Sequence, residues 1–343
     1  MLASQAAAFC FPPSAFRLLL SDHCFPPSAF CFPIMEFEIE LPASKPFDAV
    51  ALGLNATDHL IVVPHYPGFN SKVALLSHTL AAGGQCATAM VALARLGMRT
   101  RYIGKVGSDD LGRFQIHSLE SERVECGGLT IAEGADSQIA FIVIDEASGE
   151  RTVIWHRDDR LMISPDEVDQ AAVTSGRVLL LDGHNVDASI TAARYARQAG
   201  IPTVLDIDNI YPGAEGLMPL IDFLISSTSF PLRMTEETDL RLALKKLSEM
   251  TGSMFVAATL GRDGVLAYFR KEYIYSPAFT VDCKDTTGAG DAFHGGFIYG
   301  LLAGLSVEET LRVANAVAGL KCRAIGARTA LPTLEELNAL LSQ

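Results

Sequence analysis

The sequence lacks the excess of positive charge that a nucleic-acid-binding or membrane-surface protein needs. It has 27 Lys and Arg against 40 Asp and Glu, which gives a net charge of −13. Without a basic surface, binding to a polyanion would release few counterions. We therefore expect neither nucleic acid nor a membrane as a partner. A small phosphorylated ligand stays compatible with this charge, because backbone N–H groups can hold it.

The sequence also lacks paired cysteines and long apolar runs. Its seven cysteines are scattered, and no Cys-x-x-Cys pair or Cys/His cluster has the spacing of a zinc site. This pattern favours a reduced, cytoplasmic protein. No apolar run approaches the roughly 20 residues that a membrane span requires.

Residues 1–34 differ from the rest of the chain. The segment Cys-Phe-Pro-Pro-Ser-Ala-Phe occurs at 10–16 and again at 24–30, and Arg17 is the only Lys or Arg in this stretch. A secretory signal would need a basic start and an unbroken apolar core, and neither is present. We interpret residues 1–34 as a non-native or disordered extension, with a transit peptide as the weaker alternative, and expect folding to begin near Met35.

The body of the chain alternates short apolar runs with helical patterns. Apolar runs that end in polar residues occur at 48–54, 178–182, 203–206, 223–226 and 254–259. Helical patterns lie between them, which is typical of a doubly wound, mostly parallel α/β sheet with ligands at the carboxyl ends of its strands. Because no low-complexity linker divides residues 35–343, we predict one main domain. Excursions at about 57–82 and 137–160 are expected to form a small β-sheet lid.

The strongest chemical motif is Asp-Thr-Thr-Gly-Ala-Gly-Asp at 285–291. Its glycines allow a tight turn, and the small and apolar residues that follow predict a helix. A glycine-rich turn at a helix N-terminus binds anions, because its N–H groups are unpaired and the helix dipole favours negative charge. Asp291 would lie beside that site, where a carboxylate can take a proton from a hydroxyl during phosphoryl transfer.

This segment, together with Ala-Phe-His-Gly-Gly at 292–296, resembles the C-terminal signature of the ribokinase (PfkB) family of carbohydrate kinases. Residues 82–97 and 104–112 resemble the family's N-terminal signature. The resemblance covers about 45–340 and implies a ribokinase-like fold and an ATP-dependent sugar kinase that uses Mg²⁺. Thr88 and the run Leu320-Lys321-Cys322 look closest to a branch that includes sulfofructose and related ketose kinases. Homodimers formed through the lid are common in the family.

The resemblance also implies a role for individual residues. Asp291 matches the general base, and the backbone of Gly288, Ala289 and Gly290 matches the anion hole. Residues that match substrate contacts or the lid hinge are Asp58, Gly83, Gly84 and Thr88. Residues that match the nucleotide site are Thr259, Gly261, Gly264 and Asn315. Asp285 and Thr287 match ligands of a monovalent cation, often K⁺. On their own, Asp58 and Asn315 would fit exposed polar positions equally well.

The sequence departs from the family pattern at three places. Thr88 stands where Asn is common, so the substrate is expected to differ from ribose. The stretch 226–229 lacks the carboxylate of the family's Asn-x-x-Glu motif, and Asp206 and Asp208 are the nearest substitutes for ordering a metal. Arg328 is unusual in its position. Arg157, at the edge of the lid, is a candidate contact for an anionic substrate group, although exposed arginines are usually only solvated.

Two other functions remain open beside the sugar kinase. A nucleoside kinase of the same fold would place aromatic residues of the lid over the substrate, and Tyr66, Phe69 and Trp155 are available. The second alternative is a catalytically silent family member with a binding or regulatory role. The missing Asn-x-x-Glu motif favours this alternative.

Overall fold

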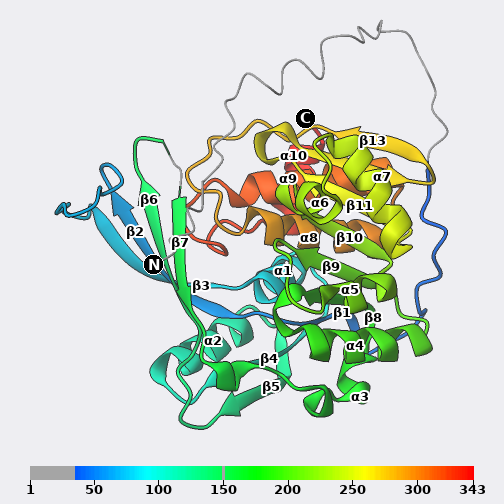
Figure 1. Ribbon diagram of the computed structural model, residues 1–343, viewed down its shortest axis with the longest axis horizontal. Helices are drawn as coiled ribbons and strands as arrows, with labels where there is room; N and C mark the ends of the chain where they lie inside the picture. The colour runs from blue at the N-terminus through cyan, green and yellow to red at the C-terminus, as the bar shows by residue number, and fades with distance from the viewer. Residues whose placement is uncertain (1–34, 149–150) are drawn as a thin grey trace, which may run out of the picture. The chain divides into compact units, whose positions relative to one another are not determined.

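A computed structural model of the protein describes residues 35–148 and 151–343. The predicted extension, 1–34, lies outside the described residues. The core is one large sheet of nine strands in the order β13-β12-β11-β10-β9-β8-β1-β4-β5 (Figure 1). These strands are β1 (Phe47–Leu52), β4 (Thr100–Gly107), β5 (Glu125–Ala132), β8 (Gly176–Asp182), β9 (Thr203–Ile207), β10 (Phe223–Ser227), β11 (Phe255–Thr259), β12 (Val265–Phe269) and β13 (Glu272–Ser276).

The sheet is parallel from β5 to β11 and antiparallel at β12 and β13. Its central strands are buried on both faces, which explains their nearly continuous apolar sequences. Parallel strands end at the same edge, so the register Asp182↔Asp206 brings the polar ends of β8 and β9 together. The predicted fold, a doubly wound and mostly parallel sheet with a small lid, is confirmed.

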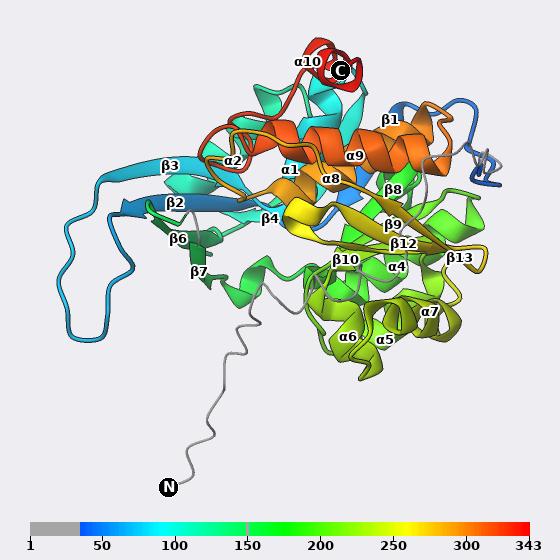
Figure 2. The same ribbon diagram turned by 90° about the horizontal axis from the view of Figure 1, so that it is seen from above.

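Helices cover both faces of the sheet (Figures 1 and 2). One face packs against α1 (Gln85–Arg95), α2 (Asp110–Glu120), α8 (Ala289–Leu302), α9 (Val307–Lys321) and α10 (Leu334–Leu341). The other face packs against α3 (Gln170–Val173), α4 (Val186–Gln198), α5 (Ala214–Leu217), α6 (Ser229–Thr235) and α7 (Leu240–Thr251). Short 3₁₀ turns occur at Asp159–Leu161, Pro165–Glu167, Gly183–Asn185, Met218–Leu220 and Gly261–Asp263. Within the described ranges, no helix is long and apolar enough to cross a membrane.

A second sheet of four strands forms the lid, in the order β3-β2-β6-β7. Its strands are β2 (Ala56–Val63), β3 (Ser77–Gly83), β6 (Ile139–Asp145) and β7 (Arg151–His156). Asp58 is paired with Ala140, and Ala140 with Trp155. Residues opposite each other in neighbouring strands share a face, so Trp155 lies on the same side of the lid as Asp58.

The sequence also predicts a strand at 101–106, which is β4, but it does not predict β5, β12 and β13. The reason is clearest for β12 and β13. They form a hairpin whose two-residue turn is Arg270 and Lys271, both with positive φ (50° and 68°). Such turns usually carry Asn or Gly, so the usual sequence signal is absent. The third strand, β5, contains two consecutive glycines, Gly127 and Gly128, which weaken strand propensity.

Candidate active site

The motif at 285–291 forms the turn that leads into α8. Gly288 has φ of +76°, and a Cβ there would lie 2.7 Å from the Cβ of Ala327, so both backbone and space require glycine. The helix begins at Ala289, which places Asp291 in its first turn. The N–H of Ala289 donates to Thr286 O at 3.1 Å, which leaves the amides of Gly290 and Asp291 as the candidate donors to an anion.

Asp291 is half-buried and has the electrostatics of a general base. Burial raises the pKa of Asp291 to about 6, the negative charge of Asp208 adds to the rise, and the positive charges of Arg328 and Lys321 oppose it. A carboxyl with this pKa is mainly ionised at neutral pH and still basic enough to accept a proton in a transition state.

Further acidic side chains lie at the ends of β8 and β9. Burial, followed by the charge of Asp291, raises the pKa of Asp206 well above its usual value. His294 Nδ1 is 3.3 Å from Asp206 Oδ2, but burial lowers the pKa of His294 to about 4. The imidazole in this contact is therefore uncharged at neutral pH, and Asp208 is the exposed carboxylate of this cluster.

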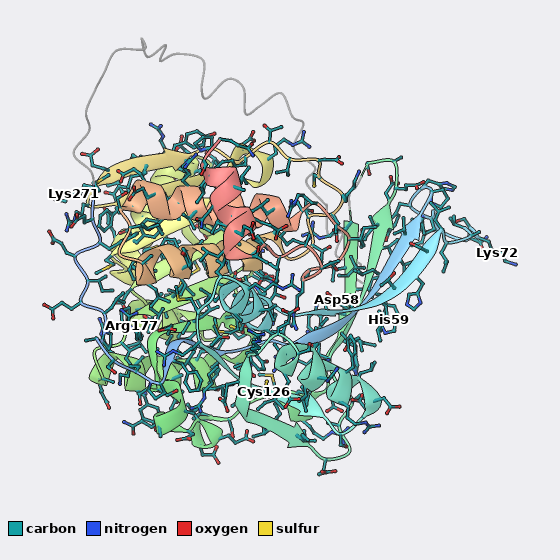
Figure 3. All side chains as sticks on the ribbon, turned by 180° about the vertical axis from the view of Figure 1, so that it is seen from behind. Asp58, His59, Lys72, Cys126, Arg177 and Lys271 are labelled. Atoms are coloured by element: carbon teal, nitrogen blue, oxygen red, sulfur yellow. The ribbon has the colours of Figure 1, made fainter. Side chains whose placement is uncertain are left out.

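The lid brings a second carboxylate to the site. Asp58 lies on β2 where the strand leaves the large sheet (Figure 3). It is buried, and burial raises its pKa to about 7; the charges of Asp291 and Asp285 add to the rise and that of Arg328 opposes it. The negative charge of Asp291 is therefore close enough to act on Asp58.

Two glycines allow the chain to pack against Asp58. A Cβ on Gly83 would lie 2.1 Å from Asp58 Oδ2, and a Cβ on Gly84, whose φ is +92°, would lie 2.5 Å from Asn55 Cα. The Nδ2 atom of Asn55 is buried and has no hydrogen-bond partner among the described residues. An unpaired buried donor beside Asp58 is suited to a ligand hydroxyl.

Arg328 connects the parts of this region. Its guanidinium donates to Thr88 Oγ1 (3.2 Å), Ser118 Oγ (3.1 Å), Asn55 Oδ1 (3.0 Å) and the carbonyl of Gly83. Burial lowers the pKa of Arg328 to about 10, so it stays charged at neutral pH. The hydroxyl of Thr88 is fully buried in this contact, and direct contact between Thr88 and a substrate stays a prediction.

The predicted nucleotide-site residues lie close to the end of β13, where this strand meets α9. The Nδ2 of buried Asn315 donates to the carbonyls of Ser276 (3.0 Å) and Pro277 (3.2 Å). A Cβ on Gly264, whose φ is +98°, would lie 2.1 Å from Ser276 O. Thr259 ends β11, directly before the turn that contains Gly261 and Gly264. Asn315 is therefore buried and links α9 to residues 276–277, and it does not lie on an exposed helix face.

Arg157 is half-buried at the base of the lid. Its guanidinium donates to Asn185 Oδ1 (2.9 Å) and to the carbonyls of Leu161 (3.0 Å) and His184 (3.4 Å). These contacts hold the lid base to the Gly183–Asn185 turn. A contact between Arg157 and an anionic substrate group stays a prediction.

Comparison with known proteins decides the family. The model of the pfkB family carbohydrate kinases matches residues 49–334. The chain belongs to this family. A relative named ATP-dependent ribose-1-phosphate kinase, from Halopiger xanaduensis, is 30% identical over 290 residues, which are 83% of this chain and 95% of the relative. The 5-dehydro-2-deoxygluconokinase of Shouchella clausii is 27% identical over 326 residues, 89% of this chain and 98% of that one.

Solved structures of pfkB-type kinases have the same fold. A putative ribokinase from Agrobacterium tumefaciens superposes with a TM-score of 0.78 at 27% identity, covering 87% of this chain and 98% of its own. An Arabidopsis thaliana ribokinase complexed with ribose and ATP has a TM-score of 0.76 at 24% identity and covers 99% of its own chain. The predicted family and the predicted sugar-kinase class are confirmed. The placement nearest the ketose-kinase branch is compatible with these relatives.

Three residues of the site were missed or left without a role in the sequence. Asn55 lies close to Asp58 in the sequence and was given no role. Arg328 was noted only as unusual in its position, and Lys321 only as part of a run that resembles the ketose-kinase branch. A signal existed for Lys321, because it follows Leu320 at the end of a helix whose other buried residues are uncharged. For Arg328 the partners come from four distant segments, and spacing along the chain cannot show such convergence.

Proposed function

We propose that this protein transfers the γ-phosphoryl group of ATP to a hydroxyl of a ketose or related sugar, with Asp291 as the general base. The carrying observation is the position of Asp291. It lies in the first turn of α8, beside the amides of an anion site, and its charge acts on Asp58 of the lid. Phosphoryl transfer needs a base, donors that stabilise the charge of the phosphate, and a group that holds the reacting hydroxyl.

The residues divide the work as follows. Asp58 accepts hydrogen bonds from sugar hydroxyls and Asn55 Nδ2 donates one, so the reacting hydroxyl is held near Asp291. Its proton passes to the Asp291 carboxylate while its oxygen bonds to the γ-phosphorus. The bond from that phosphorus to the bridging oxygen breaks, and its electron pair leaves with ADP. The amides of Gly290 and Asp291 stabilise charge on the transferring group.

ATP and Mg²⁺ enter this proposal from the family, since a relative is named as ATP-dependent and a putative E. coli ribokinase was solved with ATP and Mg²⁺. The residues present fit a partly hydrated Mg²⁺, because exposed Asp208 follows β9 and, among the described residues, accepts a hydrogen bond only through Oδ1, from the Tyr211 hydroxyl. Mg²⁺ usually takes one or two carboxylates and completes its shell with water and phosphate. Bound there, it would neutralise phosphate charge.

A nucleoside kinase is the second candidate, and Trp155 is the observation that favours it. Its side chain is 61% exposed, and the register of the lid places it on the Asp58 side. An exposed indole there could stack on a nucleobase.

A homodimer through the lid and a cytoplasmic location also stay proposals. The exposed apolar residues of β7, Val153 and Ile154, suit a lid-to-lid contact.

The test is ADP release from ATP across a panel of ketoses, aldoses, sugar acids, sugar phosphates and nucleosides, with the product identified by mass. We expect a ketose or a related sugar to be the best acceptor, and Asp291→Asn to lower kcat by about 10²–10⁴-fold, the usual contribution of a general base. Asp282→Asn, at an exposed residue paired with Lys284, is the matched control. A nucleoside as best acceptor would support the second candidate. No acceptor in the panel would point to the silent family member.

A further inference from the structure

The ammonium group of Lys321 lies inside the catalytic turn. Lys321 is the last residue of α9, and its side chain is 0% exposed. Its Nζ donates to the carbonyl oxygen of Asp285 at 2.8 Å and lies 3.9 Å from Asp285 Oδ2. Asp285 begins the motif that leads to Asp291, so a fixed positive charge is built into the base of the active site.

The family resemblance predicted a different cation at this place. Asp285 and Thr287 match ligands of a monovalent metal ion, but the oxygens of Asp285 are already engaged. Oδ1 accepts from the N–H and the hydroxyl of Thr287 at 2.8 and 2.7 Å, and Oδ2 accepts from Gly326 N–H at 2.8 Å. The carbonyl oxygen is taken by Lys321. The residues present therefore do not fit a bound K⁺.

The charges around Asp285 also argue against a bound K⁺. The ammonium group of Lys321 lies 3.9 Å from Asp285 Oδ2, and both side chains are almost completely buried. The carboxylate therefore already has a counter-charge within the protein. A second cation at this distance would be repelled by Lys321 with little solvent to screen the repulsion.

We propose that Lys321 is a tethered replacement for the monovalent cation, so that this kinase works without K⁺. Lys321 acts as a positioning residue. Its bond to the carbonyl of Asp285 orients the turn that presents Gly288–Asp291, and its charge helps to keep Asp291 ionised, as the lowering effect of Lys321 on the pKa of Asp291 indicates. The inference rests on the proposed function for its activity readout.

The first experiment uses the unmodified protein and its best acceptor. Initial rates are measured in buffer whose only monovalent cation is tetramethylammonium, and again with added K⁺ or Na⁺ at equal ionic strength. We expect kcat and KM to change by less than about twofold. Stimulation of several-fold by K⁺ over Na⁺ would overturn the proposal, whatever any variant does.

The second experiment removes the tethered charge. Lys321→Ala is expected to lower kcat by about 10²-fold, the scale of a small misplacement of catalytic groups. Added K⁺ or ethylammonium should restore much of the loss. A lysine with a merely structural role would give a loss that no cation repairs. Lys284→Ala, whose exposed partner is Asp282, is the matched control and should neither lose activity nor respond. Full activity of Lys321→Ala without K⁺ would overturn the proposal.

Thermal unfolding tests the role of Lys321 independently of the kinase proposal. K⁺ should raise the unfolding midpoint of Lys321→Ala but not that of the unmodified protein, whether or not an acceptor is known. If Lys321→Ala does not fold, Lys321→Met keeps most of the side-chain volume and serves in its place. A K⁺-dependent midpoint in the unmodified protein would contradict the inference even if it proved inactive as a kinase.

Discussion

At the scale of single residues, the site depends on carboxyl groups whose environments differ. Asp285 is ionised because a lysine and three hydrogen bonds compensate its burial. The pKa values of Asp291 and Asp58 are raised to about 6 and about 7, because burial outweighs the nearby positive charge of Arg328. Groups of one chemical type are thus prepared for different tasks: a structural anchor, a base, and an acceptor for hydroxyls.

These pKa values predict a steep acidic limb in the pH profile. If Asp291 and Asp58 must both be ionised, kcat/KM should fall below pH about 7, and more steeply below pH about 6. In Asp58→Asn, we expect a lower kcat/KM overall and a single ionisation near the pKa of Asp291. A profile that is flat from pH 5 to 8 would contradict both assignments.

The stability of the fold should depend on pH in the opposite sense to activity. An acidic group whose pKa is raised on folding stabilises the fold fully only below its unfolded pKa of about 4, and this contribution is lost as pH rises through the folded value. Asp58→Asn should therefore unfold at a higher temperature than the unmodified protein at pH 8. The difference should shrink towards pH 5 when both are followed by circular dichroism.

Residues of the site could be predicted where chemistry is local in sequence. Asp291 and Gly288 belong to one short motif in which charge, turn and helix start coincide. Asn55 and Arg328 could not be assigned in this way, because their roles depend on contacts between segments more than 200 residues apart. Lys321 was noted only within the run Leu320-Lys321-Cys322, and its role follows only from its distance to Asp285.

At the scale of elements, the junction between β3 and α1 couples the lid to the body. Gly83 ends β3, directly under the Asp58 carboxylate, and its carbonyl accepts from Arg328. Motion of the lid therefore moves Asp58 relative to Asp291, which is fixed on α8. Closure of this kind aligns the acceptor and excludes water from the reaction.

Gly83→Ala should damage the sugar side of the site selectively. The new Cβ would lie 2.1 Å from Asp58 Oδ2, so the carboxylate must shift, with a cost of roughly 1–3 kcal/mol typical of overpacking. We expect KM for the sugar to rise about tenfold or more while KM for ATP stays within about twofold. Gly68→Ala, which meets nothing within 4 Å, is the control. Equal increases in both KM values would indicate general misfolding instead.

Elements with strong periodicity were predicted closely, and those with unusual turns were not. The small and apolar residues at 86–96 predict a helix, which is α1 (Gln85–Arg95), and the pattern at 111–122 predicts another, which is α2 (Asp110–Glu120). The hairpin of β12 and β13 was missed because Arg270 and Lys271 adopt a backbone conformation that the tertiary structure imposes. The alternating pattern at 73–80 predicts a lid strand that begins at Val73, but β3 begins four residues later, at Ser77, since exposed strands lack a buried face to mark their ends.

At the scale of the whole described body, the segment from Met35 onward closes the core. The N–H of Val307 donates to Met35 O at 2.7 Å. The Phe37 ring lies edge-on to four aromatic rings of the large sheet and α8, with centroid distances of 5.3 to 5.8 Å to Phe223, Phe255, Phe269 and Phe297. Residues before β1 thus contribute to the packing that holds α8, and with it Asp291, against the sheet.

Phe37→Ala should therefore destabilise the protein without altering the chemistry of the site. Loss of a half-buried ring from an aromatic cluster is expected to lower the free energy of unfolding by about 2–4 kcal/mol, measured by urea denaturation. Activity below the transition should stay close to that of the unmodified protein, because Phe37 touches none of the proposed catalytic groups. Phe69→Ala, at a fully exposed lid position, is the control and should change stability little.

A chain that starts at Met35 should keep the stability of the unmodified protein, whereas one that starts at Pro42 should lose at least as much as Phe37→Ala. If the two truncated chains were equally stable, the aromatic cluster would not be what joins this segment to the core.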